Sequence, residues 1–519
     1  MKKHIIKSVS SLLCLLLLAA CSGSGNKADS DAYLNVIPND AMVVSKVDFN
    51  NLLVKSDILN NTFVKVEFEK AVTELPDKQN DLLKKIFANP SASGIDVDAP
   101  VYIAVQSVKP GKMIATARMS DISNFEDFIS TFVGDDFKTT QKDGMTYLAL
   151  DEVYLSLGDV ALALAYDKDK IMLVVDEYYP DLSSYTRLSM DKRAVNDEVY
   201  APLFKGDEDV ACAVNYEPIV QYIIAEKLID RELVPIVATM KENVYFTSLD
   251  FEDGYVEVKS TSDISYESRE MIEGLLKKST HRHYDYIPGN SFAVMSYNLN
   301  LIQLYSILET SGALKELAGY GVNNEVAKDL LVALSGDYTA AAWVDGDDFE
   351  DLNYMAAVDC SDRSLFDMLA AYMIMSLDAT MVEEDVYELY DGYYIMYKDN
   401  AIMLMPESIF RKINSRSGIR PLRRNINSKE LFNSSYDIVV DLRLVGNIIS
   451  KCMRDISGVL SSEQMVALDM LNTVDNLTVE TGVGNSYLRV NTTNPKINSL
   501  RYILDKYISS AVRNSRGRY

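Results

Sequence analysis

The chain has 519 residues, 48% of them hydrophobic, and a formal net charge of −25 at pH 7. That length exceeds what one hydrophobic core usually serves, so we expect about two to four globular domains. The excess of acidic residues repels nucleic acid phosphates and anionic lipid headgroups, which excludes binding to either as the main role. With only three histidines, the domains also lack the general base that Ser-His-Asp and Cys-His catalysis needs.

The first residues predict an export signal followed by a lipid anchor. Three lysines precede an apolar run at residues 12–18, which is too short to span a bilayer as a permanent helix. Leu18-Ala19-Ala20-Cys21 resembles a lipobox, so we expect residues 1–20 to be removed and Cys21 to carry the lipid. Because residues 1–20 contain three lysines and no acid, the remaining chain would hold 48 basic and 76 acidic residues, a net charge of −28. Residues 21–35 form a predicted flexible tether.

Internal repetition organises the rest of the sequence. Ile37-Pro38 and the later Val47-Asp48 recur 250 residues further on as Ile287-Pro288 and Tyr297-Asn298. We therefore divide the chain into a first half, residues 36–262, and a second half, residues 286–519. Residues 263–285 are the predicted connector, a linking helix followed by polar residues.

A buried strand, an Asp or Asn, and a second apolar run follow one another four times. A polar side chain at such a junction is suited to accept hydrogen bonds from the free amides of a first helical turn. We expect helix N-caps at all four positions, which are Asp48, Asn215, Asn298 and Asp441. Binding of ligands by these four side chains is the weaker interpretation.

Alternating apolar segments predict antiparallel strand pairs in both halves. The first half shows strands at 101–105 and 113–117, a helix around 125–129 and a hairpin at 166–173. The second half repeats this order at 338–344, 354–358, 365–369 and 397–404. Each half ends on another hairpin, with turns at Asp253-Gly254 and Gly484-Asn485. The predicted fold class is α+β, as two homologous halves, each of two antiparallel sheet-plus-helix modules, with a last amphipathic helix at 497–512.

No motif for catalysis or cofactor binding occurs. There is neither a glycine-rich phosphate loop nor a nucleophile elbow at a strand-to-helix junction. His281-x-His283 falls in the predicted connector, where a polar linker is favoured over a metal site. The acidic run at 345–351 is either a hairpin turn or a calcium loop, and its place between two predicted strands favours the turn. We therefore expect no catalytic residue, no metal and no cofactor.

The cysteines of the mature body predict free thiols. They are far apart in sequence and lack Cys-x-x-Cys spacing, so a disulfide with one leftover thiol is the weaker alternative. They are Cys212, Cys360 and Cys452.

One basic stretch opposes the overall charge. From Arg411 to Lys429 there are seven basic residues and no acid, with Gly418 and Pro421 interrupting them, so we expect an exposed loop. Guanidinium groups hold carboxylates and phosphates in two-point contacts, which favours a multivalent anionic partner. The candidate anion-binding residues are Arg416, Arg420, Arg423 and Arg424. A solvated loop that packs on the protein's own acidic surface is the alternative.

Several of these features together resemble a known family. The lipobox, the Ile-Pro-x-x-Ala start at residue 37, the strand-cap-helix repeats and the Gly94-Ile95-Asp96 turn are similar to those of uncharacterised Bacteroidota lipoproteins with a domain-of-unknown-function label. The resemblance covers nearly the whole mature chain. It implies an architecture and a location, an outer membrane lipoprotein on the periplasmic or cell-surface side, and it supplies no catalytic residue.

The sequence thus predicts a lipid-anchored envelope protein that acts as a binding or scaffolding module. Its expected partners are the membrane, through the lipid, and an anionic glycan or envelope protein, with no nucleic acid. The alternative is an extracytoplasmic, carboxylate-dependent enzyme acting on glycans. An enzyme of this kind requires a deep pocket with converging carboxylates of different pKa, whereas a binding module requires a broad apolar or tyrosine-rich surface. A carrier for other envelope proteins would expose an apolar groove between the halves.

Overall fold

The computed structural model describes residues 32–108, 111–133, 138–142, 144–149, 161–176, 182–311, 324–345, 352–389, 392–414, 437–457 and 461–516. The strands before residue 263 are β1 (Val43–Val47), β2 (Val101–Ser107), β3 (Lys112–Arg118), β4 (Thr139–Lys142), β5 (Met145–Ala149), β6 (Ala161–Tyr166), β7 (Lys170–Asp176), β8 (Val210–Asn215), β9 (Val244–Glu252) and β10 (Tyr255–Asp263). The later strands are β11 (Leu276–Lys277), β12 (Ala293–Leu299), β13 (Gly336–Val344), β14 (Leu352–Asp359), β15 (Thr380–Glu383), β16 (Val386–Glu388), β17 (Tyr393–Lys398), β18 (Ala401–Pro406), β19 (Ile438–Asp441), β20 (Val474–Gly482) and β21 (Asn485–Thr492).

Helices connect these strands. The α-helices are α2 (Phe49–Ser56), α3 (Thr62–Thr73), α4 (Asp77–Ala88), α5 (Ile122–Val133), α6 (Leu182–Thr186), α7 (Ala201–Lys205), α8 (Tyr216–Ala225), α9 (Val234–Thr239), α10 (Tyr266–Leu275), α11 (Leu301–Ser311), α13 (Asn324–Ala333), α14 (Arg363–Leu377), α15 (Glu407–Asn414), α16 (Leu442–Ser457), α17 (Ser462–Leu471) and α18 (Ser499–Arg516). The 3₁₀ turns are η1 (Ala32–Val36), η2 (Ile58–Asn60), η3 (Pro90–Ser93), η5 (Met190–Lys192), η6 (Ala194–Asn196), η7 (Arg231–Leu233) and η8 (Arg282–Asp285).

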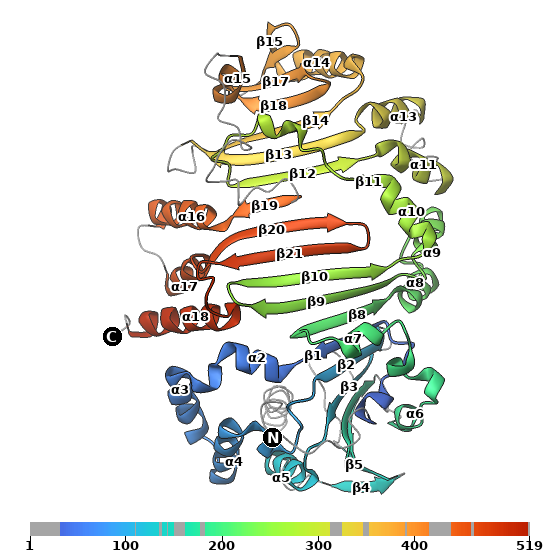
Figure 1. Ribbon diagram of the computed structural model, residues 1–519, viewed down its shortest axis with the longest axis vertical. Helices are drawn as coiled ribbons and strands as arrows, with labels where there is room; N and C mark the ends of the chain where they lie inside the picture. The colour runs from blue at the N-terminus through green and yellow to red at the C-terminus, as the bar shows by residue number, and fades with distance from the viewer. Residues whose placement is uncertain are drawn as a thin grey trace.

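All strands of the described residues belong to one antiparallel sheet, which runs along the long axis of the molecule (Figure 1). The pairings give the order β4-β5-β6-β7-β3-β2-β1-β8-β9-β10-β21-β20-β19-β12-β13-β14-β18-β17-β16-β15. The short β11 pairs with the end of β12. The fold class is therefore α+β with antiparallel pairing, as predicted, because hairpins and short connections link neighbouring strands.

Counted inward from each end of the sheet, the strands follow one another in the same pattern of chain order. The two series meet at the central pair, β10 and β21. These two strands pair antiparallel, with Tyr255 opposite Asn491 and Thr261 opposite Asn485. Tyr255 and Asn485 each follow a two-residue hairpin turn that ends in a glycine with positive φ, Gly254 at 82° and Gly484 at 77°. Glycine suits these positions because a side chain is strained there.

Buried residues gather where helices cover the sheet. In the first half, Phe125 and Phe128 of α5 are fully buried and pack with Ile86 of α4. In the second half, Phe366 and Met373 of α14 form the corresponding cluster with residues of β17. Burying each of these side chains contributes about 1.5–3 kcal/mol. In Figure 1, α16, α17 and α18 flank one side of the central strands, and α8, α9 and α10 flank the other.

Three of the four predicted N-caps are confirmed. Asp48 accepts from the Asn51 amide, Asn215 from the Glu217 amide and Asp441 from the Leu444 amide, at 2.9, 3.0 and 2.9 Å. The predicted hairpins and the C-terminal helix are also present, the helix as α18.

The predicted cap at Asn298 is wrong. This residue lies inside β12, where its side-chain Nδ2 donates to Oδ1 of the buried Asp337 at 2.9 Å. Pairing of β11 with β12 extends the strand, so α11 begins later and Asn300 accepts from the amides of its first turn.

Candidate binding sites

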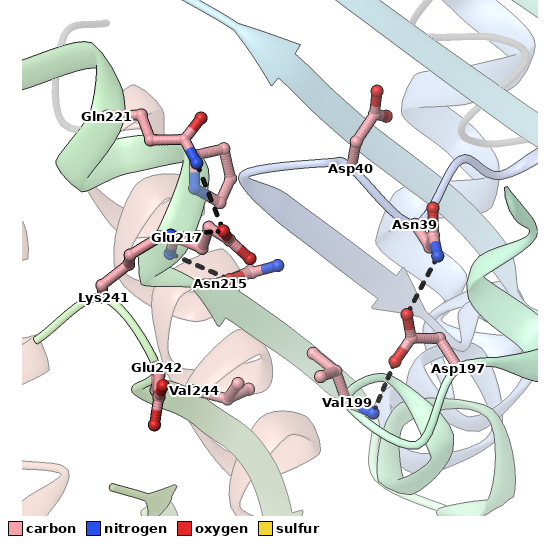
Figure 2. A pocket seen from close by; sticks show the side chains of 11 residues that line it. Asn39, Asp40, Asp197, Val199, Asn215, Glu217, Gln221, Lys241, Glu242 and Val244 are labelled. Atoms are coloured by element: carbon pink, nitrogen blue, oxygen red, sulfur yellow. Dashed lines mark hydrogen bonds and ion pairs between the residues drawn. The ribbon is translucent and has the colours of Figure 1, made fainter. Parts of the chain in front are cut away.

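A polar depression with a volume of about 450 Å³ lies at the start of α8 (Figure 2). Four segments of the chain line this depression. The turn before β1 supplies Asn39 and Asp40, and the segment before α7 supplies Asp197. The end of β8 and the first turns of α8 contribute their polar side chains, and the turn before β9 completes the rim. The remaining lining residues are Val199, Asn215, Glu217, Pro218, Gln221, Lys241, Glu242 and Val244.

Three of the four carboxylates of this depression, those of Asp40, Asp197 and Glu217, accept hydrogen bonds from the protein itself. Asp197 accepts from Asn39 Nδ2 at 3.1 Å, and Glu217 accepts from Gln221 Nε2 at 3.2 Å (Figure 2). The Lys241 ammonium lies 3.0 Å from the Glu217 carboxylate. Figure 2 shows these two sets on opposite sides of the depression. The carboxylates are therefore held apart rather than brought together on a shared proton or ligand.

This arrangement fits weak attraction of cations better than catalysis. The lining holds four acids and a single lysine, with neither histidine nor cysteine. A general acid and base pair requires carboxyl groups whose environments separate their pKa values. Burial raises the pKa of Asp48 and of Asp250, yet both residues lie outside the depression.

Those two aspartates belong to a buried charge cluster between α2, β8 and β9. Asp209, which is fully buried, accepts from Lys55 Nζ and from the Phe251 amide, both at 2.8 Å. Burial opposes the charge of Lys55, but Asp209 more than offsets this and raises the pKa of the lysine. The Lys55 contact fixes the last turn of α2 onto the sheet, so the role of the cluster is structural.

The predicted polar connector holds two buried histidines. His283 is 1% exposed, and its Nε2 lies 3.0 Å from Asp359 Oδ1. Burial opposes ionisation of Asp359, but hydrogen bonds from His283 and the Asp337 amide and the charge of Arg282 hold its pKa below the usual value. The polar connector is therefore buried at this point. The pair joins η8 to the end of β14.

One side of α14 is an exposed apolar face. Met368, Ala371, Tyr372 and Met375 repeat at i, i+3, i+4 and i+7, which places them on one side of the helix. Met368, Tyr372 and Met375 are 60%, 57% and 77% exposed. We call these four residues the α14 face. The opposite side of the helix, with Phe366 and Met373, packs on the sheet.

The edge strand beside this helix exposes two apolar side chains. β15 is exposed along its whole length, and Met381 and Val382 are 62% and 44% exposed. Polar residues occupy the strand at the other end of the sheet, β4, which reads Thr-Thr-Gln-Lys. Edge strands are usually guarded by charge or by a bulge, and β15 has both, in Glu383 and in the register shift between Met381 and Glu383.

The site residues predicted from the sequence are not placed by the structure. Cys21 and the four arginines Arg416, Arg420, Arg423 and Arg424 fall outside the described residues. Arg411, at the start of the basic stretch, lies on the helix α15, paired with Glu407, and not in a loop. The acidic run at 345–351 follows β13 and precedes β14, which pair at Val344 and Leu352. The three body cysteines are free thiols.

No helix in the described part of the chain is long and apolar enough to cross a membrane. None of the curated proteins shows significant similarity to the chain.

Among solved structures, three crystal forms of TP0453 are similar. Crystal form III has 12% identity and a TM-score of 0.27, over 48% of this chain and 86% of that one. Crystal form IV has 12% identity and a TM-score of 0.26, over 49% and 88%. Crystal form I has 10% identity and a TM-score of 0.17, over 74% and 97%. At these values the likeness supports no statement about function.

A family model matches residues 33–405, which is most of the chain and includes the depression, the buried clusters and the α14 face. The chain therefore belongs to the family described as a domain of unknown function, DUF4836.

Proposed function

We propose that this protein is a lipid-anchored module of the cell envelope that binds or scaffolds another envelope component. The observation that carries the proposal is the α14 face, where three large apolar side chains are more than half exposed on one helix. Soluble surfaces rarely keep such side chains together, and where they do, the patch usually contacts a partner. Methionine, with its flexible thioether, is suited to surfaces that adapt to what they bind.

A binding role agrees better with the described sites than the enzymatic alternative does. The depression at α8 is polar, and three of its four carboxylates accept hydrogen bonds from the protein itself. Ligand pockets are usually concave and mainly apolar, with a few convergent polar groups. The lining of the depression contains three apolar residues, Val199, Pro218 and Val244, so it is mainly polar and differs from such a pocket.

We also infer that the body consists of two copies of one fold. The order of strand pairing supports this, since β1 pairs with β2 and β8 just as β12 pairs with β13 and β19. The spacing of 250 residues also relates β1 to β12. Val43 and Ala293 are 250 residues apart, and each is the first residue of its strand to pair with both neighbouring strands. In the duplicated arrangement, β10 and β21 are equivalent strands that join the copies across the middle of the sheet.

Anchoring through Cys21 places the body at a membrane surface. Outer membrane location is part of the proposal, and it rests on the lipobox-like sequence from Leu18 to Cys21 and on the resemblance that it supports. Cys21→Ser should release the protein from membranes or leave an uncut precursor. Wild-type protein without N-terminal lipid, measured by mass spectrometry, would exclude the anchor.

The binding function can be tested by crosslinking in the native envelope. A photoreactive residue replaces Met375 on the α14 face, and the same residue replaces Met190, which is 70% exposed elsewhere, as the matched control. We expect one discrete adduct from position 375 and none from position 190. Absence of an adduct from position 375, with the protein folded and membrane-bound, would contradict the proposal.

A further inference from the structure

α14 and α5 occupy the same place in the strand order. α5 follows β3 and leads to the edge strand β4, and α14 follows β14 and leads to the edge strand β15. Both helices begin after an aspartate, Asp121 or Asp362, whose side chain accepts an amide hydrogen of the first turn at 2.8 or 2.9 Å. These caps align the two helices as far as Val133, the last residue of α5, which corresponds to Ile374 of α14.

A pair of aromatic contacts fits the same correspondence. Four residues after each capping aspartate stands a fully buried phenylalanine, Phe125 or Phe366. Phe125 lies 5.2 Å from the Tyr166 ring and Phe366 lies 5.6 Å from the Tyr397 ring, measured between centroids. Both tyrosines stand at or next to the end of the strand before a hairpin turn.

On α5, the outer side is covered by a second helix. Leu82 and Ile86 of α4 join Phe128 in one buried cluster. Gln79 of α4 donates to the carbonyl oxygen of Thr131 at 3.2 Å, and Thr131 is only 8% exposed. The first half thus contains an amphipathic helix seated on the outer side of its capped helix.

The corresponding place on α14 is open among the described residues. Tyr372 lies ten residues after its capping aspartate, as Thr131 does, and it is 57% exposed. α13 precedes β13 as η3 and α4 precede β2, but it packs against α11. At Tyr372 the α14 face is therefore open where Thr131 of α5 is covered by α4, and we call this open position the seat.

Charge around this seat is strongly negative. Residues 362–389 contain seven acids and a single base, Arg363. Arg363 is already engaged, with its guanidinium 2.6 Å from Asp385 and 3.8 Å from Glu384. On α4, the helix seated over α5, Lys78 reaches Asp127 of α5 at 3.7 Å. A partner complementary to the α14 face would therefore carry basic residues beside an apolar stripe.

We propose that the α14 face binds an amphipathic helix with basic flanks, presented by another envelope protein and seated as α4 is seated on α5. This partner chemistry rests on the binding function proposed above. Its apolar side chains would repeat at i, i+3, i+4 and i+7 and cover Met368, Tyr372 and Met375, as one amphipathic helix packs its apolar stripe on another. Its basic residues would meet Asp367 and Glu383 at the rim.

The probe for this proposal is a synthetic peptide of leucine and lysine, about 18 residues long so that it can form a helix, with leucines on one face. The control peptide carries glutamate in place of every lysine. Binding to the full chain is measured by fluorescence anisotropy. The double variant Met368→Glu with Met375→Glu removes the apolar stripe while it adds negative charge, and Met190→Glu makes the same change at an equally exposed control position.

We expect the double variant to weaken binding of the lysine peptide at least about tenfold, since two buried methionine contacts are lost. Met190→Glu should leave binding unchanged, and the glutamate peptide should not bind. Asp367→Asn with Glu383→Gln should reduce the salt dependence of binding, because exposed charge pairs are screened by salt.

Four results would overturn the proposal. Lysine-peptide binding that is unchanged or stronger in the double variant would mean that charge alone attracts the peptide. Equal binding of the glutamate peptide would exclude the basic flanks. Dimerisation of the full chain that Met375→Glu abolishes would assign the face to a second copy. Binding of zwitterionic lipid vesicles through Met375 would assign it to lipid.

Failure of this proposal is distinguishable from failure of the proposed function. A crosslinked envelope protein at position 375, together with no peptide binding, leaves the binding function in place and excludes the helix chemistry. Absence of both the adduct and the peptide binding removes both.

Discussion

Gly94 should be among the least replaceable glycines of the chain. It ends η3 with a φ of +82°, in the left-handed region that side chains rarely adopt. Its carbonyl oxygen accepts from the amides of Ser120 and Asp121 at 2.8 and 3.0 Å, next to the cap of α5. A Cβ at this position would lie 2.3 Å from the Phe125 nitrogen and 2.4 Å from the Asp121 carbonyl oxygen. Because both are backbone atoms, the start of α5 would have to move.

Gly94→Ala should therefore lower the free energy of unfolding for two separate reasons. The left-handed conformation costs about 1 kcal/mol for alanine, and the overpacking adds about 2 kcal/mol. Gly144→Ala is the matched control, since Gly144 has a φ of +78° and a Cβ added there would meet nothing within 4 Å. It should lose about 1 kcal/mol only. Urea unfolding of the full chain, followed by circular dichroism, measures the difference. Equal losses in the two variants would refute the close approach of Gly94 to α5.

Three further predictions concern single interactions and the basic stretch. Asp48→Ala removes the cap of α2 and should lower the free energy of unfolding by about 1 kcal/mol in the same assay; no loss would mean that the cap contributes nothing. Asp359→Asn should cost about 1–3 kcal/mol at pH 7 because His283 loses a charged partner. Since the pKa of Asp359 is lowered from 3.8, its contribution is present above pH 3.8 and is lost as pH falls through the folded pKa, so wild type and variant should converge in acid; a constant difference down to pH 2 would contradict this. Replacing the predicted anion-binding residues by glutamine should weaken retention of an anionic envelope component on the immobilised protein, in a salt-dependent way and with the fold intact; identical partners recovered from the envelope would end that hypothesis. These residues are Arg416, Arg420, Arg423 and Arg424.

Local sequence signals predicted the elements of this fold because they act within a few residues. The caps at Asp48, Asn215 and Asp441 need only the amides that follow them. The turn at Asp253-Gly254 needs only a residue that tolerates positive φ between two strands. For such features, the preference of the segment and its structure in the whole molecule agree.

Contacts between distant segments decided the features that the sequence did not reveal. Asn298 looks like a cap, yet it bonds to Asp337, which comes from a different strand and is fully buried. Lys46 alternates with apolar residues of β1 as a solvent-facing lysine would, but it is 1% exposed and donates to the Gly206 carbonyl oxygen at 2.5 Å. His283 pairs with Asp359 across 76 residues. No local pattern contains these partners.

The α14 face did leave a signal in the sequence. Residues 363–377 carry apolar side chains on every side of the helix, with Arg363 and Asp367 as the charged exceptions. A helix that is apolar all round is usually buried all round. The sheet covers one side, where Phe366 and Met373 are buried, and within the described residues nothing covers Met375 on the other. At the positions equivalent to Met368 and Ala371, α5 holds the polar residues Asp127 and Ser130, although α4 packs beside this helix. The apolar residues of α14 are therefore not required by the architecture, and this is the reason to look for what binds there.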